Sequence, residues 1–175
     1  MNTFKTYIAF DCTGVRDAEN SNLPTFKRLN QWKQMNPDRY NFANLEDIEF
    51  AATHDEILEN NLKHNLLEKM KRADNMIIVA SEKLNTESYM LNWQISRAVN
   101  GLHMPVIVCY AGLTSMTDEL MRDYEKWLPN KIKKYMRRKS ARIAHIPLTK
   151  DKLERALNAY SRNEGLYPWD ESTIF

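Results

Sequence analysis

Short apolar runs alternate with amphipathic stretches along the chain. Runs rich in β-branched and aromatic residues occupy 6–10 (TYIAF), 75–80 (NMIIVA) and 104–110 (MPVIVCY). Near-continuous apolar runs of this length are typical of strands that a parallel sheet buries on both faces. Two weaker segments, 40–45 (YNFANL) and 141–146 (ARIAHI), are predicted to be a second and a fifth strand.

Between these runs, apolar residues recur at three- and four-residue steps, as on one face of a helix. The strongest stripe starts at about His54 and continues to Met70. The basic region 113–142 is predicted to contain one or two helices interrupted at Pro129. Helices are expected over about 24–35, 54–70, 89–100 and 149–160, and loops at 12–22, after 45 around Asp47, and at 81–88.

This order of elements predicts an α/β fold, a doubly wound parallel sheet with right-handed crossovers. In such sheets ligands bind beyond the carboxyl ends of the strands, near the point where the strand order reverses. Phe10, Asp11, Asp47, Ser81 and the start of the helix at Tyr89 are therefore expected around one crevice.

Length and composition fit a single domain. The chain has 175 residues, and we assign 1–175 to one domain with a core at 1–112 and a C-terminal extension at 113–175. Its net charge of +2 is too small to argue for nucleic acid or a membrane surface. No apolar run approaches the roughly 20 residues that span a bilayer, and the N-terminus lacks the apolar core of a signal peptide. A cytoplasmic protein is expected.

The cysteines and histidines give no sign of a metal site. Cys12 and Cys109 each close a predicted strand, and two buried free thiols are favoured over a disulfide. Neither belongs to a CxxC motif, and the four histidines are scattered. We therefore expect no bound metal.

Several segments resemble one family. They are 7–11 (YIAFD), 31–33 (QWK), 40–42 (YNF), 76–110 and 144–157. Together they are similar to the bacterial TIR-like family, which includes the signalling subunit of Thoeris antiphage systems. The strand–loop–helix unit at 76–98 is the most specific part.

The resemblance implies a flavodoxin-like TIR-like fold and NAD as the substrate. Many members cleave the nicotinamide–ribose bond, and some make an ADP-ribose-derived signal for a separate effector protein. It also leaves a homo-oligomer open, and it gives no reason to expect a membrane or nucleic-acid partner. By position in the motifs, Phe10, Asp11, Asp47, Ser81 and Trp93 are expected to line the NAD pocket.

One residue departs from the family pattern. The helix usually carries an aromatic residue followed by the catalytic glutamate, as in W-E-I, whereas this chain reads Trp93-Gln94-Ile95. Glutamine keeps the shape and loses the negative charge that would stabilise a cationic sugar. The replacement is either natural or deliberate, and a third interpretation makes Gln94 a surface residue of a shifted helix.

Each candidate also has a plainer interpretation. Asp11 can cap a turn, Asp47 can be a solvated acid, Ser81 can cap its loop, and Trp93 can be a packing residue. The basic stretch from Lys126 to Arg142 fits a solvated helix face better than a nucleic-acid surface.

Three functions are therefore compared. The leading hypothesis is an NAD-processing enzyme of antiphage defence, weakened or inactive because Gln94 stands at the glutamate position. The alternative is a non-catalytic TIR-like module that binds a nucleotide or serves as a scaffold. A third is a nucleoside-modifying transferase on a related fold, which lacks the acidic nucleophile it needs on the helix at Tyr89. The first predicts that Gln94→Glu raises turnover.

Overall fold

A computed structural model describes residues 4–54, 59–161 and the backbone of 172–174. Five parallel strands form one sheet in the order β1-β2-β3-β4-β5. The strands are β1 (Thr6–Ala9), β2 (Asn75–Ala80), β3 (Val106–Tyr110), β4 (Ile143–Pro147) and β5 (Ser172–Ile174). The α-helices are α1 (Leu23–Met35), α2 (Leu45–Thr53), α3 (Glu59–Lys71), α4 (Tyr89–Ser96), α5 (Asp118–Asp123), α6 (Asn130–Arg138) and α7 (Lys150–Ala159). Two 3₁₀ helices, η1 (Gly14–Arg16) and η3 (Glu125–Trp127), and a π-helical segment after α4, η2 (Arg97–Gly101), are shorter.

The four strands that carry the core agree with the sequence patterns. Every residue of β1, β2, β3 and β4 is buried, as expected of apolar runs that helices cover on both faces. The predicted helices are confirmed as α1, α4, α7 and the described part of α3, whose predicted first turn at 55–58 lies outside the described residues. Strand β5 was not predicted, because its pattern in the tail is too short.

The predicted second strand at 40–45 is wrong in its extent. A single parallel bridge joins Phe42 to Thr6 on the outer edge of β1. Backbone pairing with β1 stops at Asn44, whose side chain bonds Ile8 instead. Its Oδ1 accepts from the Ile8 backbone N–H at 2.8 Å, and its Nδ2 donates to the Ile8 carbonyl at 2.7 Å. The side-chain amide thus satisfies the groups that a neighbouring strand would have bonded.

The loop predicted around Asp47 is also wrong, because α2 begins at Leu45. Glu46 and Asp47 fall in its first turn, where carboxylates interact favourably with the positive end of the helix dipole. The acidic residues that suggested a loop are instead part of a helix start.

The bridge at Phe42 defines the topology. The chain leaves β1, touches its outer edge at Phe42, and then crosses to the other side of β1 to form β2. The strand order therefore reverses at β1, as in a doubly wound flavodoxin-like sheet. This confirms the predicted fold class and places the expected ligand crevice at the carboxyl ends of β1 and β2.

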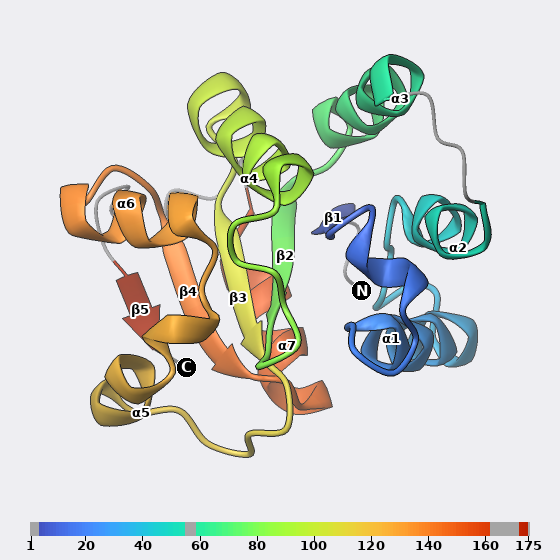
Figure 1. The fold of residues 1–175 in the computed structure, drawn as a ribbon. Helices are drawn as coiled ribbons and strands as arrows, with labels where there is room; N and C mark the ends of the chain where they lie inside the picture. The colour runs from blue at the N-terminus through green and yellow to red at the C-terminus, as the bar shows by residue number, and fades with distance from the viewer. Residues whose placement is uncertain (1–3, 55–58, 162–171, 175) are drawn as a thin grey trace.

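Helices cover both faces of the sheet (Figure 1). On one face, α1 and α7 are neighbours, since Lys150 at the start of α7 lies 5.6 Å from the Trp32 ring of α1. On the other face, α4 contacts α6, where the Lys131 backbone N–H donates to Asn92 Oδ1 at 2.9 Å. Among the described helices, none combines the length and apolar character that crossing a membrane requires.

Candidate functional site

Gln94 is fully buried where α4 meets the end of β1. Its Oε1 accepts hydrogen bonds from Tyr7 Oη at 2.8 Å and from the Phe10 backbone N–H at 3.3 Å. Its Nε2 donates to the carbonyls of Phe10 at 2.9 Å and Met90 at 3.0 Å. The amide therefore joins α4 to a strand that lies 84 residues earlier in the sequence.

This geometry suits an amide better than a carboxylate. A glutamate would still accept from the donors of Tyr7 and Phe10, but its oxygens would also face the carbonyl oxygens of Phe10 and Met90. Burial also disfavours a charge at this place, and the same burial raises the pKa of the Tyr7 phenol well above its usual value. The third interpretation, in which Gln94 lies on the surface, is wrong.

Asp11 follows β1 and is half-buried. Its Oδ1 accepts from Ser88 Oγ at 3.0 Å and from the Thr13 backbone N–H at 3.3 Å. Ser88 is itself the N-cap of α4, accepting from the Leu91 N–H at 3.3 Å. A side chain on Gly14 would collide with Asp11 Oδ2, so glycine is needed there for the carboxylate to take this position. Asp11 thus caps a turn and also faces the crevice described next.

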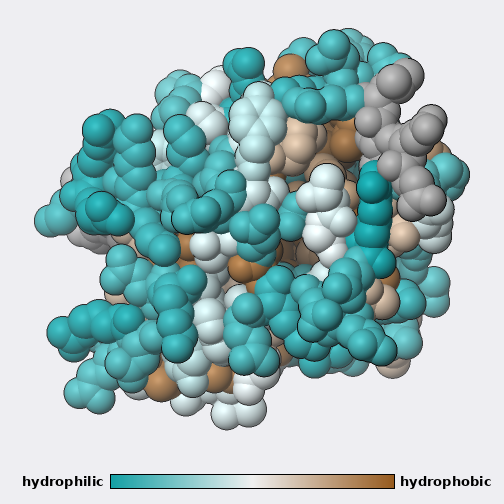
Figure 2. Space-filling view, in the orientation of Figure 1, coloured by the Kyte–Doolittle hydropathy of each residue, from teal (hydrophilic) through white to brown (hydrophobic). Residues whose placement is uncertain are grey.

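Two adjacent hollows follow the carboxyl ends of the strands. The smaller, of about 20 Å³, lies between Asp11 and Lys83, and the larger, of about 340 Å³, extends past Ser81 to Trp127. Both are lined by Ser21, Asn22 and Lys83, and we call the two hollows together the crevice, which follows the ends of β1 to β3. Figure 2 shows a largely hydrophilic face with hydrophobic atoms exposed in a recess where Figure 1 draws β1 and the loop at 81–88.

Ser81 and Asn22 form the buried polar floor of the crevice. Ser81 Oγ donates to Asn22 Oδ1 at 2.5 Å, and Asn22 Nδ2 donates to the Val79 carbonyl at 2.9 Å. These bonds hold the start of α1 against the end of β2. The strand-end rule found Ser81, but it missed Asn22, which precedes a helix rather than following a strand.

The walls of the crevice carry charged and aromatic groups. Lys83 is exposed, and its ammonium donates to the Glu19 carbonyl at 2.6 Å. Trp127 is half-buried, and its ring lies 4.3 Å from that of Tyr124. A cation, hydroxyls and an aromatic face in one hollow are the groups that hold a phosphorylated ligand with a planar ring. Sequence reasoning missed both Lys83 and Trp127.

Gln94, the predicted catalytic residue, and three further predicted site residues lie outside the two hollows. Asp47 is buried in an ion pair with Lys69 Nζ at 2.5 Å and accepts from Asn65 Nδ2 at 3.0 Å, which links α2 to α3. The Trp93 ring is half-buried, with Lys63 Nζ 5.6 Å from its centre. The Phe10 side chain is fully buried in the core, and its backbone serves Gln94. Only Asp11 and Ser81, among the predicted residues, line the two hollows.

Cys12 lies beside Gln94 but is not poised as a nucleophile. Burial and the neighbouring Asp11 carboxylate raise its pKa to about 12, which keeps it as a thiol. Both cysteines are buried and free. Within the described part of the chain, no three His, Cys, Asp or Glu side chains come together as a metal site.

Comparison with known proteins identifies the family. The sequence model of the TIR-like domain of Thoeris protein ThsB matches residues 7–116. This span runs from β1 past β3 and includes Asp11, Ser81, Lys83 and Gln94, whereas Trp127 lies beyond it. Among curated proteins, none matches the chain. The match covers more than half of the chain, which therefore belongs to the TIR-like domain family of Thoeris protein ThsB.

Proposed function

We propose that this TIR-like domain binds NAD in the crevice at the carboxyl ends of β1 to β3 and cleaves its nicotinamide–ribose bond slowly or not at all. Family membership supports a defence-related role. The observation that supports the proposal is the neutral, fully buried amide of Gln94, which we assign to the place of the family's glutamate. In an active relative, the cleaved product would give an ADP-ribose-derived signal for a separate effector protein.

The chemical argument concerns charge. Breaking the bond between nicotinamide and ribose builds positive charge on the sugar, and a fixed carboxylate stabilises that charge. An amide offers a hydrogen bond without the countercharge. Loss of about 3 kcal/mol of transition-state stabilisation slows a reaction about a hundredfold.

The proposed binding of NAD depends on groups that are present whether position 94 is glutamine or glutamate. Asp11 can accept hydrogen bonds from ribose hydroxyls, because only its Oδ1 is engaged by Ser88 and Thr13 in the described contacts. Lys83 lies where the two hollows join and can meet a phosphate. The crevice also lies at the switch point of the sheet, where ligands of doubly wound folds bind.

A second candidate function is a non-catalytic nucleotide-binding or scaffold module. The hydrogen bonds of Gln94 favour it, because Oε1 and Nε2 are both engaged with β1 and α4. An amide so engaged acts as a structural link between two elements, and it has no capacity left for a ribose hydroxyl.

The test measures binding and cleavage separately. NAD is titrated into the wild-type chain and Gln94→Glu by calorimetry, and nicotinamide release is followed with and without extract from phage-infected cells. We expect both forms to bind NAD and Gln94→Glu to release nicotinamide about a hundredfold faster. Equal rates in the two forms would show that position 94 is not the carboxylate site. Binding without release by either form supports the module, and no NAD binding by the wild type overturns the proposal.

A further inference from the structure

The crevice has two unlike ends. At the β1 end, Asp11 accepts from Ser88, the residue that caps α4, so this end adjoins the helix that carries Gln94. At the β3 end, the hollow is bounded by Gly112 and Trp127. Since β2 lies between the two strands, the ends are two strand spacings apart, about 10 Å. One end carries the Asp11 carboxylate and adjoins the helix with position 94, and the other carries the Trp127 indole.

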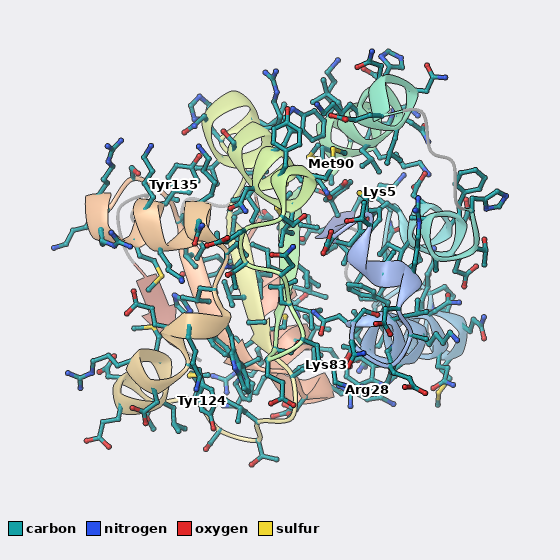
Figure 3. The ribbon with its side chains drawn as sticks, in the orientation of Figure 1. Lys5, Arg28, Lys83, Met90, Tyr124 and Tyr135 are labelled. Atoms are coloured by element: carbon teal, nitrogen blue, oxygen red, sulfur yellow. The ribbon has the colours of Figure 1, made fainter. Side chains whose placement is uncertain are left out.

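The Trp127 ring, which lines the larger hollow, is held in place by its neighbours. Its ring packs against Tyr124 at 4.3 Å with 45° between the planes, and its backbone N–H donates to the Tyr124 carbonyl at 2.9 Å. In Figure 3, Lys83 and Tyr124 are labelled in the lower part of the view and Met90 of α4 in the upper part. A supported indole that lines a hollow offers a planar base a stacking surface with little ordering of its own.

The groups between the two ends suit the charged part of a nucleotide. Lys83 lines both hollows, and its ammonium has three donors, one of which bonds the Glu19 carbonyl. Thr25 adds a hydroxyl on the α1 side of the larger hollow, and Glu82 adds an acceptor at its rim. A carboxylate of this kind can accept from the exocyclic amine of a base.

We propose that the adenine base of NAD stacks on Trp127, with the pyrophosphate beside Lys83 and the nicotinamide ribose at Asp11. The inference rests on the proposed NAD function and assigns the direction of the ligand. Direction follows from chemistry, because the bond to be cleaved must lie next to the helix that carries position 94. The other half of the dinucleotide then reaches Trp127, which lies outside the 7–116 span that the chain shares with its family.

The two halves of the ligand test this direction. AMP and nicotinamide mononucleotide each carry one nucleoside and one phosphate, so they differ in the end of the crevice that they need. Each is titrated, beside NAD, into the wild type, Trp127→Leu and Lys83→Met. We expect Trp127→Leu to weaken AMP and NAD roughly tenfold and to leave nicotinamide mononucleotide unchanged. Lys83→Met is expected to weaken all three ligands a fewfold.

Control variants separate stacking from folding. Trp32→Leu removes a half-buried indole of α1 that contacts Tyr40 and lies outside both hollows, and it should leave all three affinities unchanged. Trp127→Phe keeps a ring and should recover most of the AMP affinity. Thermal unfolding of each variant shows whether an affinity change accompanies a loss of structure.

The possible outcomes distinguish this inference from the proposed function. If Trp127→Leu is folded and binds AMP and NAD as tightly as the wild type, the placement of adenine is overturned and NAD binding stands. If Trp127→Leu weakens nicotinamide mononucleotide instead of AMP, the ligand lies in the opposite direction. If the wild type binds neither NAD nor AMP, the proposed function itself fails.

Discussion

The junction of β1 with α4 and the crevice beside it differ in how their polar groups are used. At the junction, the Gln94 amide is fully buried and bonded on both its oxygen and its nitrogen. In the crevice, Lys83 is exposed and Asp11 is half-buried. The junction is built like a core, and the crevice is built like a binding site. The two regions therefore differ in whether their polar groups are already bonded within the protein or lie open to solvent.

The largest expected effect on stability comes from removing the Gln94 side chain from the junction. Gln94→Ala leaves the Tyr7 hydroxyl and the Phe10 backbone groups buried without their partner. We expect a loss of about 4 kcal/mol in the free energy of unfolding, from unsatisfied polar groups together with a cavity. Urea denaturation measures it, and Lys83→Met in the crevice should change stability by less than about 0.5 kcal/mol. An equal loss in the free energy of unfolding for Gln94→Ala and Lys83→Met would contradict the difference between the two regions.

A second buried polar group, the His145 imidazole, makes the stability of the protein sensitive to acid. His145 of β4 is fully buried, its Nδ1 lies 3.0 Å from Tyr110 Oη, and burial lowers its pKa from 6.5 to about 4. Because the unfolded chain binds a proton more readily, stability falls as pH drops from about 6.5 to about 4, by about 3 kcal/mol in all. Unfolding curves across this range measure the slope.

His145→Gln should remove that slope, since glutamine does not titrate. The control is His64→Gln on α3, which changes an exposed histidine and should keep the slope of the wild type. A wild-type stability that stays level between pH 6.5 and pH 4.5 would contradict the burial argument.

Gln94→Glu sharpens the comparison by placing a charge in the junction. Its carboxylate would meet the carbonyl oxygens of Phe10 and Met90, so its pKa should be raised above that of the unfolded chain. Relative to the wild type, we expect a loss of about 2 kcal/mol at pH 7. The variant keeps its stability below the unfolded pKa and loses it as pH rises toward the folded pKa.

Urea unfolding of Gln94→Glu and the wild type at pH 4.5 and pH 7.5 tests this sign. The difference between the two proteins should be larger at pH 7.5. A difference that grows instead toward low pH would mean that the junction stabilises the anion, which would contradict the burial argument.

The smallest expected effect lies at the border of the two regions. Gly14→Ala pushes a methyl group against Asp11 Oδ2, so the carboxylate must shift from the position in which its Oδ1 accepts from Ser88 and Thr13. We expect a loss of about 1–2 kcal/mol and weaker NAD binding. Gly101→Ala is the matched control, because a side chain there meets no atom within 4 Å. Calorimetry and thermal unfolding of the two variants give the comparison.

Sequence patterns predicted the core of the fold well and the site only in part. Apolar runs report burial, so β1, β2, β3 and β4 were found, but burial does not reveal which side chains meet. The strand at 40–45 was overestimated because the Asn44 side chain replaces a backbone partner there. Ser81 was found by its place after β2, whereas Trp127 lies in the long connection after β3, too far from a strand end for that rule to find it.

The Asn44 amide also affects how this protein behaves at high concentration. An open strand edge offers N–H and C=O groups on which another chain can extend the sheet. Along β1, that outer edge is occupied by the Phe42 bridge and then by the Asn44 side chain, which bonds both polar groups of Ile8. A single carboxamide thus protects the edge from a strand of another molecule, and replacing it by leucine would expose a template for aggregation.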